Sequence, residues 1–353
     1  MGVNLRDLIP PEAKKEIADL RELMGKVIAL DAYNALYQFL AAIRQPDGTP
    51  LMDRKGRVTS HLSGLFYRTI NLVENGIKPV YVFDGKPPEL KREEIERRRI
   101  RREKAAELAE KARAEGRVSE VRKYAVQAIK LTQDMVESAK RLLEAMGIPY
   151  IQAPAEGEAQ AAYVAAKGDA WAAGSQDYDA LLFGAPRLVR NLAITGRRKL
   201  PGKDVYVEIK PEIIELEKLL KALGITREQL VDIAILIGTD YNPDGVEGVG
   251  PKTALQLIKI HGSLEKVLKH IGARAKFPED PLKIREYFLK PQVTDDYKIE
   301  WNEPDEKMII EILVHEHDFS LDRVQNAIQR LKKAYREYLR GRVTSLDAWF
   351  KRK

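Results

Sequence analysis

The sequence has 353 residues, of which 44% are hydrophobic and 32% charged, and its formal net charge is +7. This length suits one α/β core that carries insertions. No apolar run approaches the roughly 20 residues that span a bilayer, and the absence of cysteine excludes disulfides and thiolate metal sites. The first residues, MGVNLRDLIP, lack the pattern of a signal peptide, so we expect a cytoplasmic protein without membrane contact.

Short apolar runs alternate with helical patterns along the first half of the chain. The runs that look like buried strands, each bounded by Gly or Pro, are residues 26–30, 78–83, 148–153 and 169–174. The helical patterns are residues 32–43, 60–76, 134–147 and 158–168, and the last three end at glycines suited to helix C-caps. This alternation predicts an α/β fold with a mostly parallel central sheet and helices on both faces.

The segment from Lys86 to Lys130 holds most of the excess positive charge. It contains fifteen Lys or Arg against nine Glu, is rich in helix formers, and has no continuous apolar face. A helix of this kind does not belong in a core. It is either a solvated charged helix or a basic arm that grips phosphates.

Acidic residues follow each of the four predicted strands. In chain order they are Asp31, Asp84, Glu156, Glu158, Asp177 and Asp179, and Asp240 follows a later helical run, residues 227–238. Taken singly, each is a candidate helix N-cap or surface charge. Because the carboxyl ends of parallel strands meet at one edge of a sheet, we expect them to converge there. Without cations, these carboxylates would repel one another or some of them would have to stay protonated. Since one Mg²⁺ needs only one or two carboxylates, seven acids indicate at least two ions, and a pair of ions is the arrangement that supports phosphodiester hydrolysis.

A glycine-rich stretch, GTDYNPDGVEGVGPKTALQLI, spans residues 238–258. Gly245, Gly248 and Gly250 precede a predicted helix start at Pro251, and Lys252 adds a positive charge. A turn of this type exposes backbone N–H groups to an anion and would bind a phosphate backbone without reading sequence. It resembles the hairpin of helix-hairpin-helix modules; the alternative is an ordinary loop between helices.

Together these segments resemble the archaeal flap endonucleases, structure-specific 5′ nucleases of the XPG/Rad2-like family with a PIN-like core. The matching motifs are LDAYNALYQFL, SHLSGLFYRTINLVENGIKPVYVFDGKPPELK, APAEGEAQAA, SQDYDALLFG and GTDYNPDGVEGVGPKTA, in the family's order. The resemblance implies five parts. These are a nuclease core in two pieces (1–84 and 131–237), a basic helical arch (85–130), a helix-hairpin-helix-type element with C-terminal helices (238–340), and a tail (341–353).

The resemblance also implies roles for the acids. Asp31, Asp84, Glu156 and Glu158 would serve one Mg²⁺, and Asp177, Asp179 and Asp240 would hold a second that also lies near Glu158, with Mn²⁺ as a substitute. Asp31, Asp84, Glu158 and Asp179 would thus be catalytic as well as metal-binding. Lys91 and Arg98, at the base of the arch, would stabilise charge at the scissile phosphate.

The DNA contacts implied by the resemblance lie outside the acids. Tyr37 would stack on a base, although a helical Tyr is commonly a core residue. Thr59, Phe319 and Ser320 would line a pocket for a one-nucleotide 3′ flap. The hairpin with Gly245, Gly248, Gly250 and Lys252 would hold the duplex, with a potassium ion beside it.

The C-terminal stretch GRVTSLDAWFKRK places Leu346, Trp349 and Phe350 on a polar tail. Exposed apolar anchors of this kind dock into partner grooves, unless the tail packs on its own domain. The stretch resembles the motif that binds the sliding clamp (PCNA), with Val343 in place of the usual Gln.

With the resemblance, these observations predict a monomeric, metal-dependent endonuclease, and the resemblance implies that it removes 5′ flaps in replication, including Okazaki fragment maturation, and in repair. It would use two metal ions and also have 5′–3′ exonuclease activity. Three alternatives stay open: a bubble or recombination-junction nuclease of the same superfamily, a non-catalytic DNA-binding scaffold, and an acid-rich fold stabilised by structural cations.

Overall fold

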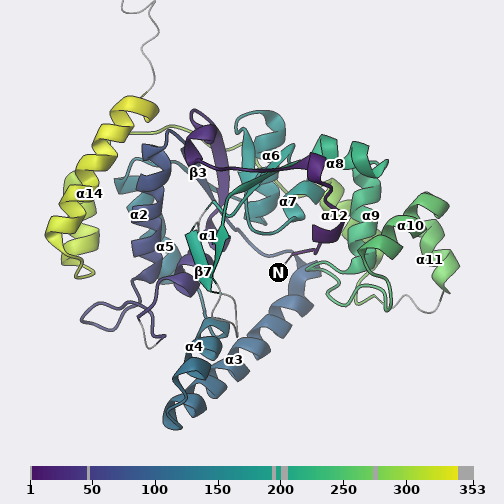
Figure 1. Ribbon diagram of the computed structural model, residues 1–353, viewed down its shortest axis with the longest axis horizontal. Coiled ribbons are helices and arrows are strands. Elements are labelled where there is room, and N and C mark those ends of the chain that lie inside the picture. The colour runs from purple at the N-terminus through teal and green to yellow at the C-terminus, as the bar shows by residue number, and fades with distance from the viewer. Residues whose placement is uncertain (1, 46–47, 193–195, 200–205, 273–276, 341–353) are drawn as a thin grey trace, which may run out of the picture.

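The computed structural model describes residues 2–45, 48–192, 196–199, 206–272 and 277–340 (Figure 1). Its centre is a seven-stranded sheet with the order β1-β9-β6-β5-β2-β3-β4. These strands are β1 (Lys14–Glu16), β2 (Val27–Asp31), β3 (Lys78–Phe83), β4 (Tyr150–Gln152), β5 (Ala172–Gly174), β6 (Arg187–Arg190) and β9 (Glu212–Glu215). A separate two-stranded sheet pairs β7 (Gly196–Lys199) with β8 (Tyr206–Ile209).

The pairing of the central sheet is mostly parallel, as predicted. Strand β2 runs parallel to both β3 and β5, β3 to β4, and β5 to β6, whereas β9 is antiparallel to β6 and β1. The register pairs Asp31 with Val82 across β2 and β3, so the residues that follow these strands leave the sheet at the same edge.

Helices cover both faces of the sheet because successive residues of its strands face opposite sides. In β3, Val80 and Val82 join the core on one face, while Tyr81 and Phe83 join the core on the other. The first face is covered by α6 (Gly157–Lys167), α7 (Asp179–Leu182) and α8 (Leu216–Leu223), and α9 (Arg227–Ile237) packs on α7. Three further helices pack on α9 away from the sheet: α10 (Pro251–His261), α11 (Leu264–Ile271) and α12 (Pro281–Leu289) (Figure 1). The second is covered by α1 (Ala32–Ala42) and α2 (Ser60–Glu74), with α5 (Gln133–Ala145) beside α2. Helix α14 (Leu321–Ala334) packs on α2 and α13 (Glu306–Ile310) on α5, farther from the sheet (Figure 1).

The basic segment forms a helical pair that projects from the body (Figure 1). Helix α3 (Arg92–Ala114) packs on α4 (Val118–Gln127) and buries small side chains such as Ala105 and Ala112. The chain reverses at Gly116, whose φ of 71° lies in the left-handed region that glycine tolerates without strain. Most of α3 is exposed to solvent, and several of its arginines form ion pairs: Arg97, Arg98 and Arg99 each contact two carboxylates.

None of the helices in the described ranges is long and apolar enough to cross a membrane. The five-part division of the chain given above stays a prediction, although the arch and the segment around α9 and α10 are distinct features of the fold (Figure 1).

Candidate active site

Two of the predicted acids end neighbouring strands and accept backbone N–H groups. Asp31 is the last residue of β2 and the N-cap of α1, where its Oδ1 accepts from Asn34 N at 2.9 Å. Asp84 follows β3 and accepts from Gly157 N, in the first turn of α6, at 2.6 Å. The N-termini of α1 and α6 thus direct their positive ends at this edge of the sheet and help to hold negative charge there.

Helix α6 adds two further carboxylates at its N-terminus. Glu156 is its N-cap, 8% exposed, and accepts hydrogen bonds from the Tyr241 hydroxyl and from Lys91 Nζ. Glu158, in the first turn, accepts from Ala180 N at 3.2 Å. This last contact joins α6 to α7, the helix that begins at Asp179.

The remaining pair of predicted acids, Asp177 and Asp179, lies after β5. Asp177 Oδ2 accepts a hydrogen bond from Asn34 Nδ2 at 3.4 Å, and the backbone N–H of Asp177 donates to Ser175 Oγ at 3.1 Å. Asp179 is only 5% exposed, and its Oδ1 accepts from Val3 N at 2.8 Å. The structure therefore brings residues from the chain's first turn and from four strand ends to one place.

Burial and mutual repulsion raise the pKa values of four of these carboxyl groups, those of Asp31, Asp84, Glu158 and Asp179. Burial, then the charges of Asp240 and Asp177, raise the pKa of Asp179 to about 8. Burial raises the pKa of Asp84 to about 6, although the N–H of Gly157 opposes this. The pKa of Asp31 also lies well above its usual range through burial and the charge of Asp84, and so does that of Glu158 through burial and the charge of Asp179.

Cations from the base of the arch reach the same group. Lys91 Nζ contacts Glu156 and lies 3.1 Å from Asp240 Oδ2, and Arg98 lies 2.7 Å from Asp240 Oδ1. Burial alone would raise the pKa of Asp240, but Lys91 and Arg98 lower it well below its usual range. Burial opposes the charge on Lys91, yet Glu156 and Asp240 outweigh it and raise the pKa of the lysine.

The donor set suits hard divalent cations, which take carboxylate oxygens and would relieve the repulsion that raises these pKa values. Within the described residues, however, no three such side chains stand ready to hold one ion. Lys91 and Arg98 engage Glu156 and Asp240, while backbone N–H groups engage Asp84 and Asp179. Uptake of an ion therefore requires some of these contacts to be exchanged.

Comparison with known proteins agrees with this arrangement. Residues 1–105 match the XPG N-terminal domain, and residues 147–240 match the XPG I-region. Flap endonuclease 1 of Hyperthermus butylicus is 69% identical over 352 residues, which is all of both chains. The chain belongs to the flap endonuclease 1 family. It is therefore a nuclease, and this family uses divalent metal ions.

Solved structures give the same family. Flap endonuclease-1 from Methanococcus jannaschii superposes with a TM-score of 0.74 at 44% identity, covering 95% of this chain and 99% of that one. The catalytic core of Rad2, solved with a DNA substrate, has a TM-score of 0.69 at 25% identity, covering 94% and 100%.

The predicted DNA contacts of this family member occupy several surfaces. Tyr37 is half-buried on α1, and the guanidinium of Arg102 from the arch lies 5.7 Å from the centre of its ring. The glycine-rich loop leads into α10, with Gly245 and Gly248 at positive φ and Lys252 exposed in the first turn.

The segments that carry Thr59, Phe319 and Ser320 lie side by side. Asp53 Oδ2 lies 3.3 Å from His317 Nδ1, and Asp318 accepts from Arg54 N at 2.8 Å. Thr59 is buried, Phe319 half-buried and Ser320 exposed. The clamp-binding candidates Leu346, Trp349 and Phe350 fall outside the described residues.

Three contributors were not predicted: Val3, Tyr241 and Asn34. Val3 carries no sequence signal, because its N–H meets Asp179 from 176 residues away. Tyr241 directly follows Asp240, so the sequence placed it next to a predicted metal ligand but did not predict its hydrogen bond to Glu156. Asn34 had the clearest signal, since it is three residues from an acid that ends a strand and begins a helix.

Replacing Gly2 by valine is expected to slow DNA cleavage in this family member by about 10- to 100-fold, the cost of a small misplacement in an active site. A Cβ at Gly2 would lie 2.5 Å from Asp179 Oδ1, so the segment that donates to Asp179 would have to move. Single-turnover cleavage checks this, with the exposed neighbour Asn4→Ala as control. Equal rates for wild type and Gly2→Val would show that this segment does not position Asp179.

Proposed function

We propose that this chain is a structure-specific endonuclease that hydrolyses a phosphodiester where duplex DNA meets a single strand and so removes 5′ flaps in replication and repair. The 5′–3′ exonuclease activity belongs to the same proposal. The observation that carries it is the group of carboxylates at the sheet edge, joined by two cations from the arch. A protein that only bound DNA would gain nothing from concentrating negative charge there.

The carboxylates divide into two sets that would hold two divalent ions. One set is Asp31, Asp84, Glu156 and Glu158, and the other is Asp177, Asp179 and Asp240 with Glu158 beside it. Mg²⁺ fits this oxygen-only set, and Mn²⁺ would substitute. When bound, the ions would activate a water and stabilise the leaving oxygen, so no side chain has to act as a covalent nucleophile.

The arch would supply the remaining charge. Lys91 and Arg98 already reach the carboxylate group from α3 and its preceding turn, so their cationic groups lie where a phosphate would approach the ions. Because the pKa values of both are raised, both stay protonated at neutral pH. They would stabilise the negative charge that develops on the phosphate during hydrolysis.

Three surfaces would orient the DNA. The loop with Gly245, Gly248 and Gly250 leads into the N-terminus of α10 and, with Lys252 beside it, would hold the duplex backbone. The N–H of Gly245 itself is donated to Asn242 O at 3.0 Å, so its part is to shape the turn. A potassium ion there is part of the proposal. Tyr37 would stack on a base under the arch, and the Thr59, Phe319 and Ser320 pocket would receive a 3′ flap. Docking on a sliding clamp through Leu346, Trp349 and Phe350, and the monomeric state, stay predictions.

Two other activities call for an explicit test. A bubble or recombination-junction nuclease would use the same acids and cut a different branched substrate, and a scaffold would bind junctions without cutting. The preferred substrate distinguishes a flap endonuclease from a bubble or junction nuclease. Cleavage itself distinguishes a nuclease from a scaffold.

The deciding experiment compares labelled double-flap, bubble, four-way-junction, single-stranded and duplex DNA in Mg²⁺. Wild type is expected to cut the double flap at its junction in preference to the others. Asp179→Asn is expected to bind the flap and cut it about 10³-fold more slowly, because metal-assisted stabilisation is worth several kcal/mol. Asp296→Asn, an exposed aspartate, is the matched control. Binding of flap DNA by wild type without any cleavage would contradict the proposed nuclease activity and favour a DNA-binding scaffold.

A further inference from the structure

Asn34 touches carboxylates that come from two different strands. Its backbone N–H donates to Asp31 Oδ1 at 2.9 Å, and its side-chain Nδ2 donates to Asp177 Oδ2 at 3.4 Å. Asp31 ends β2, whereas Asp177 lies in the loop after β5, 143 residues from Asn34. One residue therefore spans the two carboxylate sets that were assigned above to different ions.

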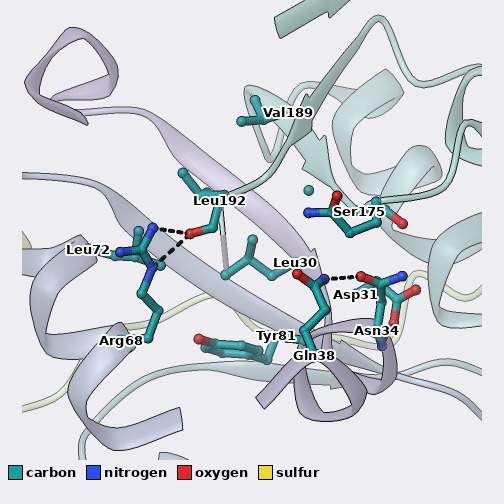
Figure 2. A pocket seen from close by; sticks show the side chains of 13 residues that line it. Leu30, Asp31, Asn34, Gln38, Arg68, Leu72, Tyr81, Ser175, Val189 and Leu192 are labelled. Atoms are coloured by element: carbon teal, nitrogen blue, oxygen red, sulfur yellow. Dashed lines mark hydrogen bonds between the residues drawn. The ribbon is translucent and has the colours of Figure 1, made fainter. Parts of the chain in front are cut away.

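Gln38, one helical turn after Asn34, fixes the orientation of that amide. Gln38 Nε2 donates to Asn34 Oδ1, as Figure 2 shows beside Asp31. Since the Asn34 oxygen is taken by Gln38, the Asn34 nitrogen is the group left to face Asp177. Reversing the Asn34 amide would place an oxygen against the Asp177 carboxylate and replace a hydrogen bond by repulsion.

Ser175 holds Asp177 from the other side. Its hydroxyl accepts the Asp177 N–H at 3.1 Å, and its hydrogen bond to Glu158 opposes the rise in the pKa of that residue. Asp31, Asn34, Gln38 and Ser175 all line the same cavity (Figure 2). The place of Asp177 relative to Asp31 is thus set by neutral amide and hydroxyl groups that hold no charge of their own.

We propose that Asn34, oriented by Gln38, is a positioning residue that sets the separation of the Asp31 and Asp177 carboxylates and so governs how tightly the site takes up its divalent ions. This inference rests on the proposed function, since it concerns the ions that the nuclease would use. An amide suits this role because it donates to a carboxylate without neutralising it, which leaves the full negative charge for the ion.

The Gln38→Glu variant gives the sharpest test. The carboxylate that this substitution introduces accepts hydrogen bonds and does not donate, so it draws the Asn34 nitrogen and turns the Asn34 oxygen toward Asp177. Positioning therefore predicts weaker metal binding. Simple electrostatics predicts the opposite, because the substitution adds a negative charge beside a cation site.

Binding of Mn²⁺ to the full chain without DNA, measured by electron paramagnetic resonance, separates the two. Asn34→Ala is expected to weaken Mn²⁺ binding about 10- to 100-fold, as loss of a hydrogen-bond partner of a metal ligand does. Gln38→Leu is expected to weaken Mn²⁺ binding by a smaller factor. Gln38→Glu is expected to weaken it more than Gln38→Leu does. The exposed amide variant Gln133→Glu is the matched control and is expected to bind like wild type. In flap cleavage, raising the Mg²⁺ concentration is expected to restore most of the lost rate.

Tighter binding by Gln38→Glu, or unchanged binding by Asn34→Ala, would overturn the proposal. If Asn34→Ala fails to fold, the two Gln38 variants decide it alone. Cleavage by wild type with unchanged Mn²⁺ affinity in the variants would defeat only this inference. Absence of metal-dependent cleavage by wild type would instead defeat the proposed function.

Discussion

Replacing Lys91 by methionine is expected to slow flap cleavage by about 10²- to 10³-fold, the range measured when one charge-stabilising donor is removed from an active site. Methionine keeps the length of the side chain but removes its charge. Lys91 now lies between Glu156 and Asp240, with its Nζ 3.1 Å from Asp240 Oδ2. It holds two of the predicted metal ligands and is placed to meet the scissile phosphate.

The same variant is expected to bind divalent ions more tightly in the absence of DNA. The lysine pairs with Glu156 and Asp240, so an ion that binds these carboxylates has to displace it, and methionine offers no such competition. A slower rate with tighter metal binding is a combination that simple misfolding does not produce.

Single-turnover cleavage and Mn²⁺ titration measure the two effects. Lys104→Met, an exposed lysine farther along α3, is the control and is expected to change the rate by less than about threefold, as a screened surface charge does. Weaker Mn²⁺ binding by Lys91→Met would show that the lysine supports the ion site and does not compete for it.

Four strands of the large sheet, β2, β3, β4 and β5, were predicted from short apolar runs, whereas β1, β6 and β9 were not. The run that became β2 is apolar and β-branched, and its helix begins at an acid that caps it. By contrast, β1 has the sequence KKE and β9 has the sequence EIIE, and these two strands, which lie far apart in the chain, pair in antiparallel orientation. The strand structure of β1 comes from tertiary pairing, which overrides a weak local preference, whereas β9 holds two β-branched residues in a run of only four.

The candidate site shows the same division between local and long-range information. The convergence of acids could be anticipated because strand ends of a parallel sheet share one edge. The partners of those acids could not, because Val3 meets Asp179 and Tyr241 meets Glu156 across long stretches of chain. Spacing along the sequence also gave no indication that cations from the arch would form ion pairs with Glu156 and Asp240.

In the presence of a chelator, the melting temperature is expected to fall as the pH rises from 6.5 to 8. An unfolded aspartate has a pKa of about 3.9, whereas that of Asp179 is about 8 in the fold. The folded state therefore binds this proton more tightly. The resulting stability is complete below pH 4 and is lost as the pH rises through 8, at up to about 1.4 kcal/mol per pH unit.

Other groups define the pH window. Asp84 has a pKa of about 6, so the stability that its protonated form contributes is lost mainly below pH 6. Burial lowers the pKa values of His61 and His317, which makes stability rise with pH, but only up to about 6.5, where an unfolded histidine titrates. The lowered pKa of Asp240 gives stability that is lost only in acid. Between pH 6.5 and 8 the raised carboxyl groups dominate.

Asp179 alone then accounts for roughly 2 kcal/mol across this window, a shift of a few degrees in the melting temperature. Asp179→Asn is expected to flatten the curve, and the exposed control Asp296→Asn to leave it unchanged. Mg²⁺ binds the ionised carboxylates of the folded chain, so its stabilising effect grows with pH and opposes the fall. Scanning calorimetry in chelator and in Mg²⁺ measures both slopes. A flat chelator curve shared by wild type and Asp179→Asn would mean that the buried carboxyl groups do not repel one another as their positions indicate.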